Sequence, residues 1–112
     1  MSNPASNLRE IEERCSKVFE MPEFRLIAWV GVFGSFSDGG HTARSDIDLL
    51  VGFKGGTSDD EIYYMADLEE PLNIATKRDI DILFMDNNEP PSFVKAQSLL
   101  TGKTIYETGT WL

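Results

Sequence analysis

The stretch GVFGSFSDGGHTARSDIDLLV, residues 31–51, interrupts an apolar sequence with a Gly-Ser pair and with two aspartates one residue apart. Side chains of a strand alternate between its two faces, so Asp46 and Asp48 share one face of a strand predicted over residues 45–53. Ile47, Leu49 and Val51 fall on the other face, and Leu50 falls on the face of the aspartates. Charges on an edge strand also discourage aggregation, so this pair alone does not establish a functional site.

The composition predicts one globular domain over residues 1–112. The chain is 41% hydrophobic and 26% charged, which is typical of a folded protein and not of a disordered or fibrous one. No apolar run approaches the roughly 20 residues of a membrane helix, and the first residues lack a signal-peptide pattern, so we expect a cytoplasmic protein. The single cysteine, Cys15, falls at an apolar helical position and is predicted to fill the core.

The charge balance argues against long nucleic acids as partners. The formal net charge is −9, whereas proteins that bind a phosphate backbone cluster Lys and Arg on one surface. The basic residues are scattered along this chain, and nearly all are predicted to be solvated surface. Nucleotides remain compatible with an acidic protein when a metal ion screens their phosphates.

Hydrophobic periodicity predicts helices that alternate with strands. Asn7 and Glu10 are typical of a helix start, and Pro22 ends that helix. A second helix is expected to begin at the capping box of Ser58 and Glu61 and to kink or stop at Pro71. The predicted strands cover residues 25–33, 45–53 and 78–85, and a last helix covers residues 92–102.

The fold class that follows is α/β (α+β), with a small mixed three-stranded sheet flanked by helices. The element order is αβ(α)βαβα, in which the bracketed helix would follow the Gly-Ser turn. A short connection between the first two strands allows an antiparallel pair, and the helix before the third strand permits a parallel crossover.

A second acidic segment turns the aspartate pair into a candidate cluster. Asp79 and Asp81 lie in the same apolar setting on the third predicted strand. Carboxylates brought close together repel one another unless a hard cation lies between them, and oxygen ligands suit Mg²⁺ or Mn²⁺. Gly34 allows a tight turn and Ser35 offers a hydroxyl and an amide, which would suit a phosphate, although Gly-Ser pairs also occur in ordinary turns.

The spacing of these residues resembles a known family. Gly34-Ser35, ten intervening residues and Asp46-Ile47-Asp48 form the pattern G-S-x10-D-x-D, which resembles the signature of DNA polymerase β-type nucleotidyltransferases. The segments RDIDILF and LLTGKTIYE are also similar to segments of that family. The resemblance covers almost the whole chain, which looks like a minimal nucleotidyltransferase (MNT).

The resemblance implies a role for each matching residue. Gly34 and Ser35 would hold a nucleoside triphosphate such as ATP, and Asp46 and Asp48 would bind two Mg²⁺ ions, with Mn²⁺ as an alternative. Asp81 would share in metal binding and help to activate the acceptor hydroxyl. Two metal ions about 4 Å apart stabilise both the attacking and the departing oxygens of such a transfer.

The third acid and one loop need closer attention. Asp81 is preferred over Asp79 because its apolar-Asp-apolar-apolar context matches the family.

Many relatives have G-S-x-A-R-G, whereas this chain has Asp38 where arginine is common. Arg44 of the same loop either replaces that cation or is a solvated loop residue, and His41 is either a ligand or base or a surface residue.

The resemblance also implies a biological setting. MNT proteins pair with HEPN-domain proteins as antitoxins that transfer AMP to a tyrosine hydroxyl, so we expect a nucleotidyltransferase that modifies a partner protein, with acceptor recognition from that partner or from a second copy of this chain. The alternatives are a non-catalytic module that neutralises a partner by complex formation, and transfer to a small molecule. The aromatic residues that are candidates for a partner surface, or else ordinary core, are Tyr63, Tyr64, Tyr106 and Trp111.

Overall fold

The computed structural model describes residues 3–34, 42, 45–54, 58, 65–84 and 102–108, in which helices and strands alternate. The helical elements are α1 (Leu8–Phe19), the short 3-10 helices η1 (Pro22–Phe24) and η2 (Met65–Leu68), and α4 (Glu69–Thr76). The strands are β1 (Ile27–Phe33), β2 (Ile47–Phe53), β3 (Ile80–Phe84) and β4 (Lys103–Glu107). None of the helices in these segments is long and apolar enough to span a membrane.

The strands form one mixed sheet in the order β3-β2-β1-β4. β1 runs antiparallel to both β2 and β4, and β2 runs parallel to β3. The predicted α/β class and the predicted directions of the first three strands are therefore confirmed. The predicted count of three strands is wrong, because Lys103–Glu107 adds a fourth. That segment buries only Ile105, so its pattern gives little hydrophobic signal.

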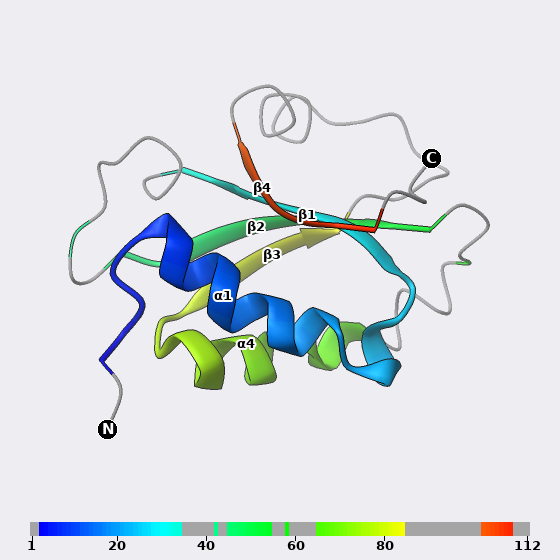
Figure 1. Cartoon of the computed structure of the whole chain (residues 1–112), viewed down its shortest axis with the longest axis horizontal. Helices are drawn as coiled ribbons and strands as arrows, with labels where there is room; N and C mark the ends of the chain where they lie inside the picture. Colours follow the sequence, from blue (N-terminus) through cyan, green and yellow to red (C-terminus); the bar gives the residue numbers. More distant parts are fainter. Residues whose placement is uncertain are drawn as a thin grey trace.

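Both longer helices cover the same face of the sheet (Figure 1). β2 turns Ile47, Leu49 and Val51 toward them, as its alternation predicts. The other residues buried in this layer are Ala5, Ile11, Cys15, Val18, Phe19, Phe24, Ile27, Val30, Val32, Phe53, Leu68, Leu72, Ile80 and Ile105. The opposite face of β2 is thereby left for Asp48.

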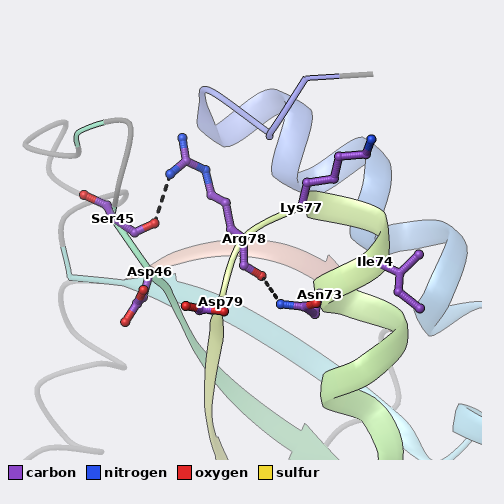
Figure 2. A pocket seen from close by; sticks show the side chains of 7 residues that line it. All are labelled: Ser45, Asp46, Asn73, Ile74, Lys77, Arg78 and Asp79. Atoms are coloured by element: carbon purple, nitrogen blue, oxygen red, sulfur yellow. Dashed lines mark hydrogen bonds between the residues drawn. The ribbon is translucent and has the colours of Figure 1, made fainter. Parts of the chain in front are cut away.

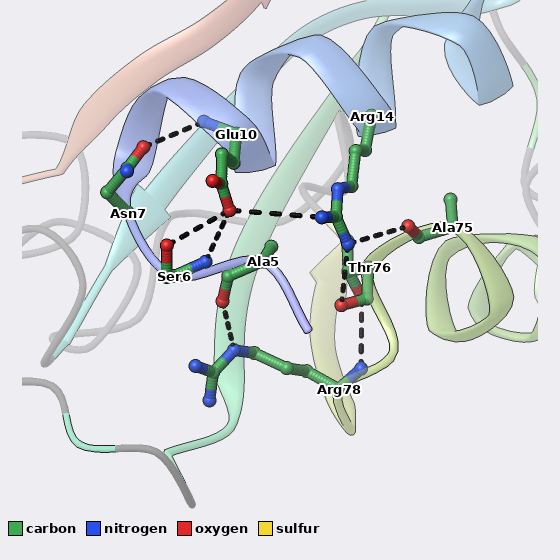
Figure 3. Close-up of polar contacts among 8 residues, drawn as sticks. All are labelled: Ala5, Ser6, Asn7, Glu10, Arg14, Ala75, Thr76 and Arg78. Carbon is green, nitrogen blue, oxygen red and sulfur yellow. Dashed lines mark hydrogen bonds and ion pairs between the residues drawn. The ribbon is translucent and has the colours of Figure 1, made fainter. Parts of the chain in front are cut away.

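The start of α1 agrees with the prediction from Asn7 and Glu10. The Asn7 side chain accepts a hydrogen bond from the Glu10 amide at 3.0 Å. The Glu10 carboxylate in turn accepts bonds from the Ser6 amide and hydroxyl, at 2.7 and 3.1 Å (Figure 3). These hydrogen bonds hold the pKa of Glu10 below its usual value, and the bond from the Ser6 amide has the larger effect. The cap thus fixes where the amphipathic helix begins.

Two details of the core bear on earlier expectations. Cys15 is fully buried, and burial raises the pKa of its thiol to about 12, so it fills the core as predicted. Tyr106 is half-buried and its ring lies 5.2 Å from that of Phe19, which places it against α1. The other aromatic candidates for a partner surface, Tyr63, Tyr64 and Trp111, lie outside the described residues, as does the predicted last helix over 92–101.

Of the two outcomes expected at Pro71, a kink or a stop, the stop is wrong. Pro71 lies in the first turn of α4, which begins at Glu69 and continues to Thr76. A first-turn proline is tolerated because its missing amide would have no partner within the helix. Glu61 of the predicted capping box lies outside the described residues.

Replacing Leu49 tests how strongly the apolar face of β2 holds the sheet to the helices. Leu49 is fully buried, so Leu49→Ala should lower the free energy of unfolding by about 2–5 kcal/mol. Urea denaturation followed by far-UV circular dichroism measures the change. Ile74→Ala is the matched control, since Ile74 is 66% exposed and its truncation should cost no more than about 0.5 kcal/mol. Equal losses in both variants would contradict the assignment of this face to the core.

Candidate active site

Four carboxylates gather where β2 and β3 begin. The parallel register pairs Asp48 with Asp81 and Ile47 with Ile80. Asp46 directly precedes Ile47 and Asp79 directly precedes Ile80, so these two aspartates lie side by side, as Figure 2 shows. Neighbouring residues in register point to the same face of a sheet. The structure thus brings together Asp46, Asp48 and Asp81, the three acids singled out in the sequence, with Asp79 beside them.

Asp48 is the electrostatic centre of this group. Its side chain is half-buried, whereas Asp46 and Asp81 are exposed. Burial raises the pKa of Asp48 above its usual value, and the negative charges of Asp81 and then Asp46 raise it further. Asp48 therefore experiences the like-charge repulsion that a bound cation would relieve.

Gly34 closes the other side of Asp48. Phe33, the last residue of β1, is the register partner of Asp48, so the chain turns at Gly34 directly beside the carboxylate. Gly34 has a left-handed φ of 72°, and a Cβ placed on it would lie 2.5 Å from Oδ2 of Asp48. The left-handed backbone therefore favours glycine here, and a side chain at this position would displace the Asp48 carboxylate. Ser35, Asp38, His41 and Arg44 lie outside the described residues.

An open hollow adjoins the carboxylates at the end of the sheet. Its volume is about 530 Å³, and Asp46 and Asp79 form one wall of it (Figure 2). Its other lining residues are Ser45, Asn73, Ile74, Lys77 and Arg78. Asp46 and Asp79 are therefore accessible from this hollow.

The donor set fits a hard divalent cation. Carboxylate oxygens are the ligands that Mg²⁺ and Mn²⁺ prefer. In the described part of the chain, no three His, Cys, Asp or Glu side chains converge closely enough to hold a metal ion by themselves. The arrangement accordingly suits an ion that takes only one or two ligands from carboxylates and the remainder from substrate phosphates and water, as Mg²⁺ commonly does.

Arg78 is a residue of this region whose role the sequence did not reveal. It is only 8% exposed, although the basic residues were expected to be almost all solvated surface. One terminal nitrogen donates to the carbonyls of Thr42 and Ser45, at 3.3 and 3.0 Å, directly before Asp46. The only available signal was its position next to Asp79 in RDIDILF.

A comparison with protein families decides the identity. The family model described as "Polymerase beta, Nucleotidyltransferase" matches residues 13–110. The chain belongs to this nucleotidyltransferase family. The family assignment made from Gly34-Ser35 and the two aspartate segments is confirmed. No curated protein sequence matches this nucleotidyltransferase significantly.

Solved structures show the same fold. A toxin-antitoxin structure with AMP-PNP aligns with a TM-score of 0.64 at 22% identity, covering 88% of this chain and 74% of the other. A chain from the structure of a tri-AMPylated Shewanella oneidensis HEPN toxin in complex with an MNT antitoxin aligns with a TM-score of 0.57 at 21% identity. The alignment covers 89% of this chain and 72% of the other. A protein classified provisionally as a minimal nucleotidyltransferase aligns with a TM-score of 0.64 at 26% identity, covering 87% and 94%.

The contact between Gly34 and Asp48 predicts a measurable coupling. Gly34→Ala should cost about 1–2 kcal/mol of unfolding free energy from the left-handed backbone alone, with a further cost from the contact with the carboxylate. In a background of Asp48→Ala only the backbone cost should remain. Denaturation of the two single variants and the double variant gives the coupling energy. A coupling near zero would show that the carboxylate does not confine this glycine.

The raised pKa of Asp48 predicts a trade-off between stability and site charge. A carboxyl whose pKa is higher in the folded state destabilises that state above both pKa values, and the penalty fades as the pH falls toward the ordinary value of 3.8. Asp48→Asn should therefore raise the melting temperature at pH 7.5 in EDTA, by an amount equivalent to at most about 1 kcal/mol because solvent screens a half-exposed group.

The pH dependence provides the control for this prediction. The difference between Asp48→Asn and wild type should vanish near pH 3.5, and Asp67→Asn, at an exposed aspartate outside the cluster, should leave stability within about 0.5 kcal/mol at either pH. An Asp48→Asn variant that melts earlier than wild type at pH 7.5 would show that the carboxylate is stabilised by its surroundings.

Proposed function

We propose that this nucleotidyltransferase transfers AMP from ATP to a hydroxyl group of a partner protein of the HEPN type. The observation that carries the proposal is the pairing of Asp48 with Asp81 in the parallel register, beside the turn at Gly34. Acids from two strands and the turn at Gly34 thus lie together at one end of the sheet.

The proposed roles follow the placement of each group. Asp46, Asp48 and Asp81 would share the binding of two Mg²⁺ or Mn²⁺ ions, each ion taking one or two of these carboxylates, and the metals when bound would stabilise negative charge on the transferring phosphate and the leaving pyrophosphate. Gly34 has no side chain to obstruct a phosphate at the end of β1. Ser35 would add its hydroxyl and amide as donors to the triphosphate.

The reaction is a substitution at the α-phosphorus of ATP. The acceptor hydroxyl oxygen forms a bond to that phosphorus, the bond to the pyrophosphate oxygen breaks, and Asp81 accepts the hydroxyl proton. Asp81 suits this step because it is exposed, and thus accessible to an acceptor, and lies in register with Asp48. Its charge also acts on Asp48, which ties it to the proposed metal ligands.

The choice of AMP and of a HEPN partner is supported by the structural neighbours. One neighbour is a toxin-antitoxin structure with AMP-PNP, and another pairs an MNT antitoxin with a tri-AMPylated HEPN toxin. Applied to this chain, these neighbours suggest an antitoxin that acts in the cytoplasm by AMPylating its toxin. The net charge of −9 agrees with a protein acceptor better than with a long nucleic acid.

Label transfer tests this function. The protein is incubated with α-labelled ATP, Mg²⁺ and the protein encoded by the neighbouring gene, which the proposal expects to be of the HEPN type, and covalent label on that partner is quantified. The double variant Asp46→Asn/Asp48→Asn should lose at least about 100-fold in rate, because two metal ligands are removed. Asp67→Asn, an exposed aspartate outside the cluster, is the matched control and should retain the wild-type rate within about twofold.

Each outcome decides between the candidate functions. Transfer that survives the double substitution would refute the assigned metal ligands. A wild-type protein that forms a stable complex with the partner but transfers no label would favour the non-catalytic binding module, which the replacement of a common arginine by Asp38 supports. Label found on a small molecule in place of the protein would favour transfer to a small-molecule acceptor.

A further inference from the structure

Arg78 connects three separate parts of the chain at the end of the sheet that bears the acids. Its Nε donates to the carbonyl of Ala5 (Figure 3), and its Nη1 donates to the carbonyl of Ser45 (Figure 2). Nη1 also donates to the carbonyl of Thr42. These acceptors lie in the segment before α1 and in the segment before β2. A buried guanidinium that spans such distant segments fixes their relative positions.

The segment that Arg78 grips is the turn directly before Asp46. The Ser45 amide donates to the carbonyl of Thr42 at 3.1 Å, and the Thr42 amide donates to Oγ of Ser45 at 2.8 Å. The two carbonyls that Nη1 of Arg78 binds therefore belong to Thr42 and Ser45, the residues that close this turn. The next residue along the chain is Asp46, so the turn and the hydrogen bonds from Arg78 fix the position of Asp46.

The backbone of Arg78 is itself held firmly. The Arg78 amide donates to Oγ1 of Thr76 at 3.3 Å, and its carbonyl accepts from Nδ2 of Asn73 at 2.8 Å. The following residue, Asp79, accepts a hydrogen bond from the Ile47 amide at 2.9 Å. Arg78 is thus anchored to α4 through its backbone and lies next to the first hydrogen bond between β2 and β3. Its side chain binds the turn that leads into β2.

We propose that Arg78 is a positioning residue, which holds the entry of β2 so that Asp46 and Asp48 stand in register with the acids of β3. The inference rests on the proposed function, because it concerns the same carboxylates. Only arginine suits the position, since its planar fork directs donors to carbonyls in different segments. Lysine presents a single compact charge and cannot span them.

Amide hydrogen exchange tests the clamp without reference to metal or activity. Variants Arg78→Lys and Arg78→Met should accelerate exchange of the Ser45 and Ile47 amides by about tenfold or more, because the turn and the first bond to β3 open more often. The Lys54 amide, which bonds the carbonyl of Leu26 at the far end of β2, is the internal reference and should change no more than about threefold. A purely global loss of stability would accelerate all three amides together.

Arg14 provides a matched control variant. It also donates to two backbone carbonyls, those of Ala75 and Thr76, both at 3.5 Å, and it pairs with Glu10 at 3.9 Å (Figure 3). None of these contacts involves the turn before Asp46. Arg14→Met should therefore leave the ratio of Ile47 to Lys54 exchange at the wild-type value.

Binding of Mn²⁺, measured by calorimetry with the metal alone and with a non-hydrolysable ATP analogue, gives the second readout. Arg78→Lys and Arg78→Met should weaken Mn²⁺ binding by about 10-fold or more, as loss of an outer supporting residue commonly does, and Arg14→Met should not. Wild-type Mn²⁺ affinity in Arg78→Met, or unchanged exchange at Ile47, would overturn the inference. A wild-type protein that binds no Mn²⁺ would instead refute the proposed function, and the exchange measurement would still decide the role of Arg78.

Discussion

The burial of one face of β2 against α1 and α4 is the constraint on which the site depends. A strand alternates with a period of two, so a slip of one residue would carry Asp48 into the core and Leu49 out of it. Leu49 is fully buried among residues of both helices, and the cost of exposing it fixes the register. The hydrophobic layer thereby determines which face of the sheet carries the carboxylates, although it makes no contact with a substrate.

The site itself opposes folding, and the rest of the molecule offsets that cost. Asp48 carries a raised pKa because burial and two neighbouring charges disfavour its ionised form. Gly34 adopts its left-handed conformation without strain, because it has no side chain, and so adds no such cost. An unfavourable carboxylate environment of this kind is typical of functional sites, where a well-packed scaffold maintains it. The layer formed by α1, α4 and the sheet provides that scaffold here.

The sequence reveals most of this arrangement, and what it hides has a physical cause. Asp46, Asp48 and Asp81 are visible because charges stand out in apolar strands, and the spacing from Gly34 identifies the family. β4 is hidden because a short edge strand with one buried residue leaves almost no periodic pattern. Arg78 is hidden because its partners are backbone carbonyls, which no side-chain pattern reports.

The mixed directions of the strands explain why this small sheet can assemble such a site. An antiparallel β1 ends where β2 begins, which brings Gly34 to Asp48. A parallel β3 begins where β2 begins, which brings Asp81 to Asp48. If β3 ran in the opposite direction over the same span, Asp81 would pair with Leu50, about 7 Å farther along the strand. The two carboxylates would then be too far apart to serve one site. The parallel crossover through α4 is therefore the feature of the topology that makes the proposed chemistry available.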